Sequence, residues 1–389
     1  MGRFFVCKLK YVLLILSLPS VLIKLTNGYT TIRIERGDIG MSFSKEKRLE
    51  INKALVREIA KYNTNPIQTI VDRFGISRQT AHKYLTALMA DGTVLTDGKR
   101  GKYRIKETEY NFVYSIKGLE EDVVWRQDIF PLLVDLPRNV LHICNYGFTE
   151  MLNNAIDHSD AEKVNVFVNV SPISVEFGIL DYGIGIFNKI QIALGLEDPK
   201  HSILELAKGK LTTDPNRHSG EGIFFTSRVF DEFYIRSGDL QFFSGRESDK
   251  DYLVDDLKET KGGTCVIMTI SKDSNIVLKE VFDSFTAKAD AEFGFSKTHI
   301  PVRLVEHEGA MLVSRSQAKR LIRRFDRFME VLLDFNGVSE IGQAFADELF
   351  RVFPLDHPNV ELIPINMTDD VKKMVFRAIG NRTNKNVSN

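Results

Sequence analysis

The first part of the chain combines helical spacing of apolar residues with a short stretch of strand-like alternation. The predicted helices cover residues 50–62, 66–75 and 76–92, and two short strands flank a Gly-rich basic turn within residues 93–105. Ser77 is the expected N-cap of the third helix, and Gly92 ends it. The pattern therefore predicts three helices followed by a hairpin.

The middle of the chain pairs strand-like segments with an unusual helix. Residues 163–170 and 174–180 are rich in β-branched side chains and predict a pair of strands. Before them, residues 149–159 have apolar side chains at helical spacing. The same stretch is crowded with polar groups, namely Glu150, Asn153, Asn154, Asp157 and His158. Because such groups are costly to bury without partners, this helix is expected to carry a functional site.

The last third of the chain alternates between the two periods and is expected to be α/β. Strands are predicted at residues 299–305, 329–338 and 359–367, and helices at residues 314–328, 340–353 and 368–379. Residues 107–136 are expected to form a connector that contains a helix, with Trp125 packed against a domain face. Together the patterns predict an α/β multidomain protein.

Composition and charge add to this organisation. The chain has 389 residues, of which 43% are hydrophobic and 27% charged, which suggests two or three globular domains. Residues 41–106 contain 14 Lys and Arg residues against 6 Asp and Glu residues, whereas residues 107–389 contain 32 against 44. A basic head on an acidic body indicates a polyanionic partner for the head. The three scattered cysteines fit a reducing cytoplasm.

Residues 1–40 have a different character. Arg3, Lys8 and Lys10 precede an apolar run that is similar to the core of a signal peptide and short for a membrane span. The codons for residues 35–41 can include a ribosome-binding sequence, so Met41 is the expected start and the first 40 residues are a doubtful leader. A membrane tether is the alternative; otherwise no membrane association is expected.

Residues 41–106 resemble a winged helix-turn-helix domain. The short turn between the second and third helices is typical of that fold. The resemblance implies that the third helix reads base edges of duplex DNA and that the strand turn contacts phosphates. The residues this implies are Ser77, Arg78, Gln79, Thr80, His82 and Lys83 on the helix, and Lys99 and Arg100 on the wing. A helical protein–protein module with a solvated basic face is the alternative.

Residues 137–272 carry three spaced motifs. They are the stretch from Glu150 to Asn154, the Asp181-x-Gly183-x-Gly185 sequence and the Gly220-Glu221-Gly222 sequence. A later Gly-Thr pair places Thr264 at the start of an apolar strand. In this order the motifs resemble the N, G1 and G2 boxes of the GHKL ATPase superfamily, which includes gyrase-type topoisomerases and histidine kinases. The resemblance implies a Bergerat-type α/β sandwich that binds ATP and Mg²⁺.

Each motif has a role implied by this resemblance. Asn154 would hold Mg²⁺, Asp181 would accept a hydrogen bond from the adenine amino group, and backbone N–H groups before the helix at Gly222 would meet the phosphates. Residues 188–217 would form a lid in which Lys208, Lys210 and Arg217 are candidate phosphate contacts, with a solvated loop position as the alternative for each. The full expected ATP-binding set is Asn154, Asp157, Asp181, Gly183, Gly185, Lys208, Lys210, Gly220, Glu221, Gly222 and Thr264.

Glu150 decides between types of chemistry. Helical spacing puts it on the same face as Asn154, one turn away. In the resembling hydrolases a carboxylate at this position polarises the attacking water, whereas in anti-sigma serine kinases it activates a hydroxyl. A sensor histidine kinase is disfavoured because no dimerising hairpin with a phosphoacceptor histidine is present in the sequence. Glu150 is therefore the expected catalytic residue.

Residues 280–389 resemble STAS-like domains, the fold of anti-sigma-factor antagonists. The resemblance is carried by one strand-loop-helix unit, residues 331–349. Gln343 stands at the position where phosphorylated members carry a serine, which argues against a phosphoswitch there. The basic stretch at residues 319–327 is expected to be solvated, with contact to a partner or nucleic acid as the alternative.

The combined expectation is a cytoplasmic, DNA-binding, ATP-hydrolysing regulator in which nucleotide state controls the arrangement of the domains. A serine/threonine protein kinase acting on a STAS-type partner and a non-catalytic ATP-binding scaffold are the two alternatives. Duplex DNA is the expected partner. A protein partner of the STAS-like domain and a homodimer are left open.

Overall fold

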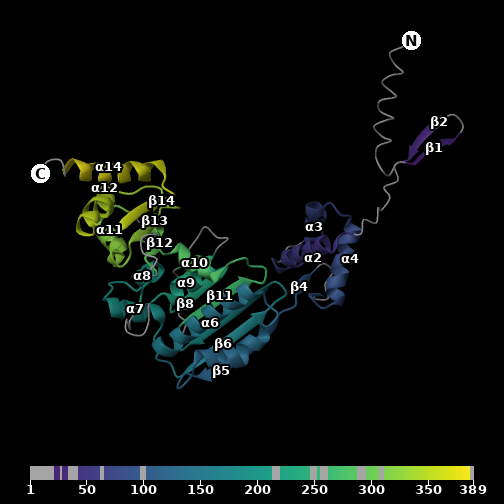
Figure 1. The fold of residues 1–389 in the computed structure, drawn as a ribbon, viewed down its shortest axis with the longest axis horizontal. Coiled ribbons are helices and arrows are strands. Elements are labelled where there is room, and N and C mark those ends of the chain that lie inside the picture. The colour runs from purple at the N-terminus through teal and green to yellow at the C-terminus, as the bar shows by residue number, and fades with distance from the viewer. Residues whose placement is uncertain are drawn as a thin grey trace, which may run out of the picture. The chain divides into compact units, whose positions relative to one another are not determined.

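The computed structural model describes most of the chain (Figure 1). The described residues are 22–26, 29–33, 43–61, 65–96, 102–212, 220–245, 252–254, 262–286, 295–305 and 311–385. By its internal contacts the chain divides into two compact units, residues 1–88 and 89–389, and each is described by itself. Within the described ranges no helix has the length and apolar character needed to cross a membrane.

The first unit contains the predicted helices. They are α2 (Lys45–Ala60), α3 (Pro66–Phe74) and α4 (Arg78–Ala90), and a hairpin of β1 (Leu22–Thr26) and β2 (Tyr29–Arg33) precedes them. Gly75 ends α3 in the left-handed conformation, with φ of 64°, and its N–H donates to the Val71 carbonyl at 2.9 Å. Ser77 caps α4, because its hydroxyl accepts the N–H of Thr80 at 3.1 Å. These local signals were readable from the sequence.

The second unit begins with the predicted hairpin and continues into a seven-stranded sheet. The hairpin pairs β3 (Val94–Thr96) with β4 (Tyr103–Ile105). The sheet has the order β10-β9-β8-β11-β7-β6-β5, and every neighbouring pair is antiparallel. Its strands are β5 (Thr108–Ser115), β6 (Lys163–Val170), β7 (Ser174–Asp181), β8 (Glu232–Ser237), β9 (Leu240–Gly245), β10 (Tyr252–Val254) and β11 (Cys265–Ser271).

One face of this sheet is covered by two helices, α6 (Arg138–His158) and α9 (Gly222–Val229), which also contact each other. Side chains alternate along the strands, so that Val164, Val166 and Val168 of β6 are buried and the residues between them are partly exposed. The same alternation puts Val175, Phe177, Ile179 and Asp181 of β7 on the buried side. A carboxylate thus ends a row of apolar core residues.

The segment expected to be only a connector contributes to the sheet. Strand β5 pairs with β6 along its whole length, from Thr108 opposite Val170 to Ser115 opposite Lys163. The following α5 (Glu121–Val124) and the π-helical turn at Trp125–Ile129 form the predicted helix. Trp125 packs on Phe148, with ring centroids 5.8 Å apart, which confirms its expected packing. The sequence signal for β5 is the alternation of partly buried Tyr110, Phe112 and Tyr114 with exposed residues.

Three short helices lie around the sheet domain. Helices α7 (Ile186–Leu194) and α8 (His201–Lys208) follow β7, and α10 (Leu278–Ser284) follows β11. Helix α8 is buried on nearly all sides, since every residue from Ser202 to Lys208 is buried. It contacts α7 and α9 within the sheet domain and also the next strand, β12, of the C-terminal region.

The C-terminal region is built around a parallel sheet of order β12-β13-β14. Its strands are β12 (Lys297–Pro301), β13 (Glu330–Asp334) and β14 (Glu361–Ile365), and its helical elements include α11 (Arg315–Ile322), α12 (Gln343–Asp347), the π-helical turn Glu348–Val352, α13 (Phe353–Asp356) and α14 (Asp369–Lys385). The alternation of helices and parallel strands confirms the α/β prediction for this region.

Several predicted elements of this region are shorter in the structure than the sequence suggests. The first predicted strand, residues 299–305, ends at Pro301 in β12, and a 3₁₀ turn follows at Val302–Val305. The predicted helix 314–328 ends at Ile322, and a separate turn follows at Phe325–Arg327. The break falls at Arg324, which has φ of 65°, a left-handed conformation that no helix can contain. Arginine has good helix propensity, so the sequence pattern alone did not reveal the break.

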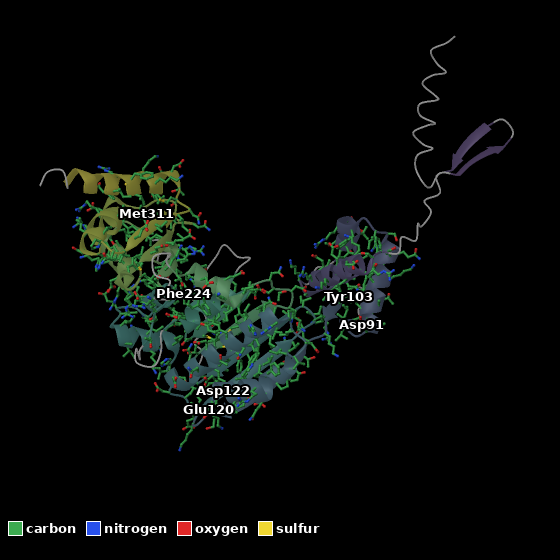
Figure 2. The ribbon with its side chains drawn as sticks, in the orientation of Figure 1. Asp91, Tyr103, Glu120, Asp122, Phe224 and Met311 are labelled. Carbon is green, nitrogen blue, oxygen red and sulfur yellow. The ribbon has the colours of Figure 1, made fainter. Side chains whose placement is uncertain are left out.

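A cluster of phenylalanines joins the sheet domain to the C-terminal region. Phe224 of α9, labelled in Figure 2, lies 4.4 Å from Phe295 between ring centroids, and Phe295 in turn lies 5.5 Å from Phe328. The buried apolar residues form one continuous cluster that extends from Val124 to Ala378. Because the two regions share a core, a change in one is felt by the other.

Candidate functional site

Helix α6 places two of the predicted site residues. Its buried face includes Phe148, Met151, Leu152 and Ala155, which pack in the core. Glu150 and Asn154 lie between this face and solvent, are both partly buried, and are separated by one helical turn. The sequence folds locally as a helix because its apolar positions recur at helical spacing, and this spacing also brings the two polar groups to one side.

The end of strand β7 supplies a buried carboxylate. Asp181 is 5% exposed, and its Oδ1 accepts the backbone N–H groups of Gly183 at 2.9 Å and Thr264 at 3.1 Å. Burial raises the pKa of the Asp181 carboxyl above its ordinary value, although these hydrogen bonds act in the opposite direction. Because both backbone bonds use Oδ1, the second oxygen can accept a hydrogen bond from a ligand.

Thr264 connects this strand end to the helix that follows it. The Thr264 hydroxyl accepts the N–H of Ile186 at 3.0 Å, and its carbonyl accepts the N–H of Asp181 at 3.0 Å. Gly185 precedes the helix with φ of 86°, a conformation that glycine adopts without strain. The loop between β7 and α7 is therefore fixed at both ends by hydrogen bonds to Thr264, one to its hydroxyl and one to its carbonyl.

These elements enclose a cavity of about 320 Å³. Such a volume lies at the lower end of the range of small-molecule sites. Its lining includes seven of the residues predicted to form the site, which are Glu150, Asn154, Asp181, Gly185, Gly220, Gly222 and Thr264. The structure thus brings together residues that are separated by up to about a hundred positions in the sequence.

The Glu150 carboxylate lies against the first residue of α9. A β-carbon at Gly222 would overlap Glu150 Oε2, so a larger residue at position 222 would displace the carboxylate. The first N–H groups of any α-helix lack partners within the helix and carry partial positive charge. Burial, with the nearby carboxylates of Glu150 and Glu221, raises the pKa of the Tyr146 hydroxyl.

Asn154 is oriented with its carbonyl oxygen available. Its Nδ2 lies 4.0 Å from the sulfur of Met151, while its Oδ1 has no hydrogen-bond partner among the residues that the structure describes. An amide oxygen is a ligand type that Mg²⁺ accepts. Over those described residues, no group of three or more His, Cys, Asp or Glu side chains is arranged to hold a metal ion.

Several predicted site residues do not line the cavity. Asp157 is exposed on α6, Gly183 packs against the carbonyl of Ser159, and Glu221 lies just outside the lining. Arg217 is outside the described residues. The predicted lid, residues 188–217, is described up to Thr212.

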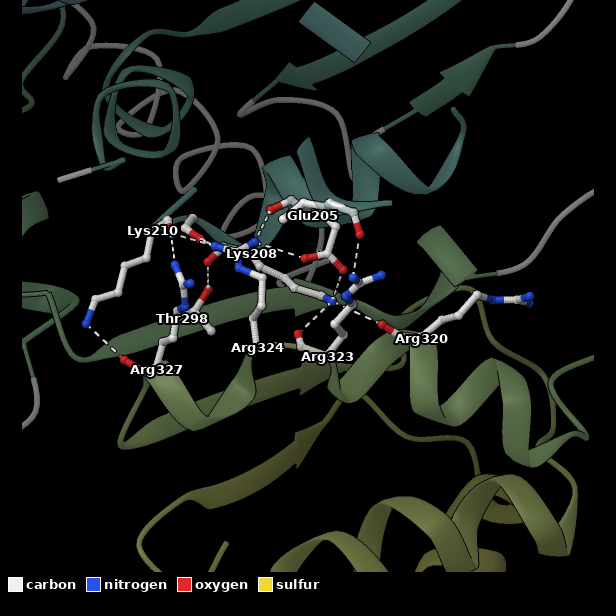
Figure 3. A network of polar contacts seen from close by, with 10 residues as sticks. Glu205, Lys208, Lys210, Thr298, Arg320, Arg323, Arg324 and Arg327 are labelled. Atoms are coloured by element: carbon white, nitrogen blue, oxygen red, sulfur yellow. Dashed lines mark hydrogen bonds and ion pairs between the residues drawn. The ribbon is translucent and has the colours of Figure 1, made fainter. Parts of the chain in front are cut away.

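Lys208 and Lys210 are corrections to the predicted phosphate contacts. The Lys208 ammonium is fully buried and donates to Glu205 Oε1 at 2.7 Å (Figure 3). The Lys210 ammonium donates to the Arg327 carbonyl at 2.9 Å. Both side chains therefore point to the C-terminal region. The sequence suggested phosphate binding because lysines in a loop near a Gly-rich motif are common phosphate ligands, but tertiary contacts that no local pattern signals direct them elsewhere.

Other cavity residues were missed by sequence reasoning. Lys189 of α7 lines the cavity, and its ammonium donates to the His158 carbonyl at 2.6 Å and to Asp160 Oδ2 at 3.3 Å. Leu206 and Leu211 form part of the opposite wall. A single cation four residues after Gly185 gave a weak signal for Lys189. Nothing in the local pattern distinguished the two leucines from ordinary core residues.

The predicted DNA-contact residues occupy one face of α4 and its N-cap. Ala81, Leu85 and Leu88 are buried on the other face. The residues Ser77, Arg78, Gln79, His82 and Lys83 are exposed, and Thr80 is partly buried. Lys99 and Arg100, predicted for the wing, lie outside the described residues. The exposed face of the first half of α4 is therefore polar and basic, while DNA contact stays a prediction.

A second cluster of polar residues lies at the C-terminal end of strand β13. Asp334 Oδ1 accepts from the Asn336 N–H and the Asn366 amide, each at 2.9 Å, and Oδ2 lies 3.0 Å from His299 Nε2. Although burial favours the neutral acid, these hydrogen bonds lower the pKa of Asp334 below its ordinary value. The loop after β13 leads to α12, which begins at Gln343 after Gly342, three residues later than the predicted helix.

A family model described as a STAS-like domain of unknown function (DUF4325) matches residues 317–372. Residues 317–372 are STAS-like by this match, which supports a STAS-like domain in the C-terminal region. The match extends from α11 to the start of α14 and confirms the sequence prediction for this part of the chain. A search of curated proteins finds no match to the chain.

Proposed function

We propose that the chain is an ATP-binding and ATP-hydrolysing regulator with a GHKL-type nucleotide domain and a winged-helix DNA-binding head. The observation that carries the proposal is the cavity, which is lined by residues of all three motifs and by Thr264. An antiparallel sheet covered on one face by α6 and α9 is consistent with a Bergerat-type sandwich. The motifs were chosen from the sequence alone, so their meeting around one cavity supports the proposal.

Three contacts follow for the nucleotide. The Asp181 carboxylate accepts a hydrogen bond from the adenine amino group, because a carboxylate accepts hydrogen bonds and cannot donate them. The backbone N–H groups at Gly220 and Gly222, at the start of α9, bind the phosphates. Asn154 would hold a magnesium ion, which neutralises phosphate charge when bound.

Glu150 is the proposed general base. Its carboxylate takes a proton from water as the water oxygen attacks the terminal phosphorus, and the bond to the bridging oxygen breaks to release ADP. The position of Glu150 beside the start of α9 puts the base next to the proposed phosphate site. Asn154, one turn further along α6, completes the same end of the cavity.

Binding of Mg²⁺-ATP to the full chain tests the proposal. Asn154→Ala should abolish magnesium-dependent binding measured by calorimetry, because it removes the oxygen ligand. Asn145→Ala is the matched control, since Asn145 lies on the same helix and is exposed. A wild-type chain that is folded and binds no adenine nucleotide at millimolar concentration would refute the proposed function.

The DNA-binding part of the proposal is supported by the exposed polar face of α4. Arg78→Ala and Gln79→Ala should reduce discrimination between DNA sequences, as expected for groups that reach base edges. Lys53→Ala is a control in the same unit, because Lys53 is exposed on α2. The measurement is a titration of labelled duplex DNA at several salt concentrations, where binding should weaken steeply with salt. No binding at low salt would rule out this role.

A serine/threonine protein kinase is the second candidate, favoured by the STAS-like domain in the same chain. Glu150 would then take the proton from a serine hydroxyl instead of water. Incubation with ATP labelled in the terminal phosphate separates the two. Label released as free phosphate supports hydrolysis, whereas label retained on a protein supports the kinase.

A further inference from the structure

The segment from Glu205 to Leu211 has two sides with different contacts. Leu206 and Leu211 line the cavity. Three other side chains of the segment contact the STAS-like domain instead, namely Glu205, Lys208 and Lys210. One short segment is therefore both a wall of the cavity and a contact surface for a different domain.

A buried cluster of charges joins this segment to the STAS-like domain. Glu205 Oε1 accepts from Lys208 Nζ at 2.7 Å, and Glu205 Oε2 accepts from Arg324 Nη1 at 2.9 Å (Figure 3). The three side chains are 3%, 0% and 8% exposed. Lys208 also donates to the carbonyls of Arg320 and Arg323, at 3.1 and 2.9 Å. A buried ion pair of this kind tolerates little displacement, because each charge depends on its partners.

Arg324 also holds the backbone that leads into the cavity wall. Its Nη2 donates to the carbonyls of Gly209 at 2.8 Å and Lys210 at 2.6 Å. Both residues have positive φ, 79° and 48°, and such a conformation persists in lysine only where surrounding contacts enforce it. Arg327 Nη1 adds a bond to the Lys210 carbonyl at 3.0 Å. Two arginines of the STAS-like domain thus fix the turn.

The turn determines where the next residue lies. The N–H of Leu211 donates to the Gly220 carbonyl at 3.1 Å, so this bond connects the turn to the glycine motif of the cavity. A β-carbon at Gly220 would overlap the backbone of Leu211, which shows how closely the backbones at these two residues approach each other. Leu211 and Gly220 both line the cavity. A shift of the turn would therefore move two parts of the lining.

We propose that Arg324 is a positioning residue through which the STAS-like domain controls nucleotide binding in the cavity. The inference rests on the proposed nucleotide function. Arg324 does not line the cavity and acts through the turn at Gly209 and Lys210. By reciprocity, a protein that binds the STAS-like domain and displaces Arg324 weakens nucleotide binding, and nucleotide weakens that protein's binding by the same factor.

Two variants of the full chain test the proposed positioning role of Arg324, and a third variant is their control. Arg324→Gln removes the charge and the two carbonyl bonds, and Arg327→Gln removes one exposed bond to the same turn without uncovering a buried charge. Arg320→Gln is the control. It keeps the backbone carbonyl that Lys208 uses, and within the described residues its own Nε has no hydrogen-bond partner.

The expected result is a graded loss of Mg²⁺-ATP affinity. Arg324→Gln should raise the Kd by a factor within the range of about 5–150 that is typical of coupling between sites. Arg327→Gln should raise it less, Arg324→Lys should restore part of the loss, and Arg320→Gln should match wild type. Phe350→Leu, a core change in the STAS-like domain away from the cavity, shows whether destabilisation alone has this effect.

Hydrogen exchange measured without nucleotide supplies an independent readout. The amides of residues 206–211 should exchange faster in Arg324→Gln and Arg327→Gln than in Arg320→Gln. If wild type binds ATP and the folded Arg324→Gln and Arg327→Gln variants bind it equally well, the positioning role is wrong and the proposed function stands. If wild type binds no nucleotide, the proposed function fails and this inference fails with it. An affinity loss equal in Phe350→Leu would also overturn the specific role of Arg324.

Discussion

The two walls of the cavity are built in different ways. One wall consists of α6, the end of β7 and Thr264, and hydrogen bonds within the sheet domain hold its polar residues. The other wall, with Leu206 and Leu211, is held by arginines more than a hundred residues later in the chain. Chemistry is therefore expected from the first wall, and control by another domain from the second.

The largest effect should come from the base on the first wall. Glu150→Gln keeps the size and hydrogen-bonding capacity of the side chain but cannot take a proton, so turnover should fall by about 10²–10⁴-fold. ATP affinity should change little, because the proposed base contacts water. The measurement is phosphate release at saturating ATP. Glu162→Gln, an exposed carboxylate outside the cavity, should keep wild-type turnover. Wild-type turnover by Glu150→Gln would show that Glu150 is not the base, and the proposed catalytic role of the first wall would then be wrong.

The second-largest effect concerns the stability of the other wall. Glu205→Gln leaves the buried charges of Lys208 and Arg324 without their counter-charge, and breaking a buried pair in this way costs about 3–5 kcal/mol. The free energy of unfolding should fall by that amount in a denaturant titration followed by the fluorescence of Trp125, the one tryptophan of the chain. Glu197→Gln, exposed between α7 and α8, should have little effect.

A compensating variant sharpens this result. If the loss arises from unpaired buried charge, Glu205→Met combined with Lys208→Met and Arg324→Met should recover much of the stability, because apolar side chains of similar volume replace buried ion pairs well. Under the proposed control mechanism, the same triple variant should still bind nucleotide weakly. Recovery of both stability and nucleotide affinity would show that the contacts of Arg324 do not control nucleotide binding in the cavity.

The difference between the walls also explains what the sequence revealed. Glu150, Asn154 and Asp181 lie on elements that local apolar patterns specify, and their motifs resembled a known superfamily. The STAS-like strand-loop-helix unit could also be recognised, because its apolar pattern and its motif lie within one short stretch of the sequence. Lys208 and Lys210 were misassigned because their partners, Glu205, Arg320 and Arg327, are fixed by tertiary packing. The left-handed conformation of Arg324 had no signal in its residue type.

Asp181 should produce a moderate effect on the first wall. Asp181→Asn keeps the oxygen that accepts from Gly183 and Thr264 and replaces the other oxygen with a donor. Loss of a hydrogen bond to a charged group costs about 1.5–3 kcal/mol, so ATP affinity should fall by about 10- to 150-fold. Discrimination between ATP and GTP should narrow as well. Asp283→Asn, exposed on α10, is the control, and unchanged nucleotide selectivity would show that Asp181 is only a structural carboxylate.

The smallest expected effect is a pH dependence of the free energy of unfolding that arises from Lys208, beside the second wall. Burial lowers the pKa of Lys208 to about 8 from its ordinary value of 10.5, and the nearby Arg323 and Arg324 add to this against the opposing effect of Glu205. Between these two values the unfolded chain keeps a proton that the folded chain has lost. The Lys208 contribution to the free energy of unfolding should therefore rise as pH increases from about 8 to 10.5.

Comparison with Lys208→Met isolates this contribution, since all other titrating groups are shared. The wild-type free energy of unfolding, measured by denaturant titration from pH 7 to pH 10.5, should increase relative to that of the variant across the window and stay parallel to it below pH 7.5. Nucleotide affinity should change in the same window, because neutral Lys208 has two N–H donors for the three acceptors it now contacts. A stability difference that does not vary with pH would mean that Lys208 keeps an ordinary pKa in the folded chain.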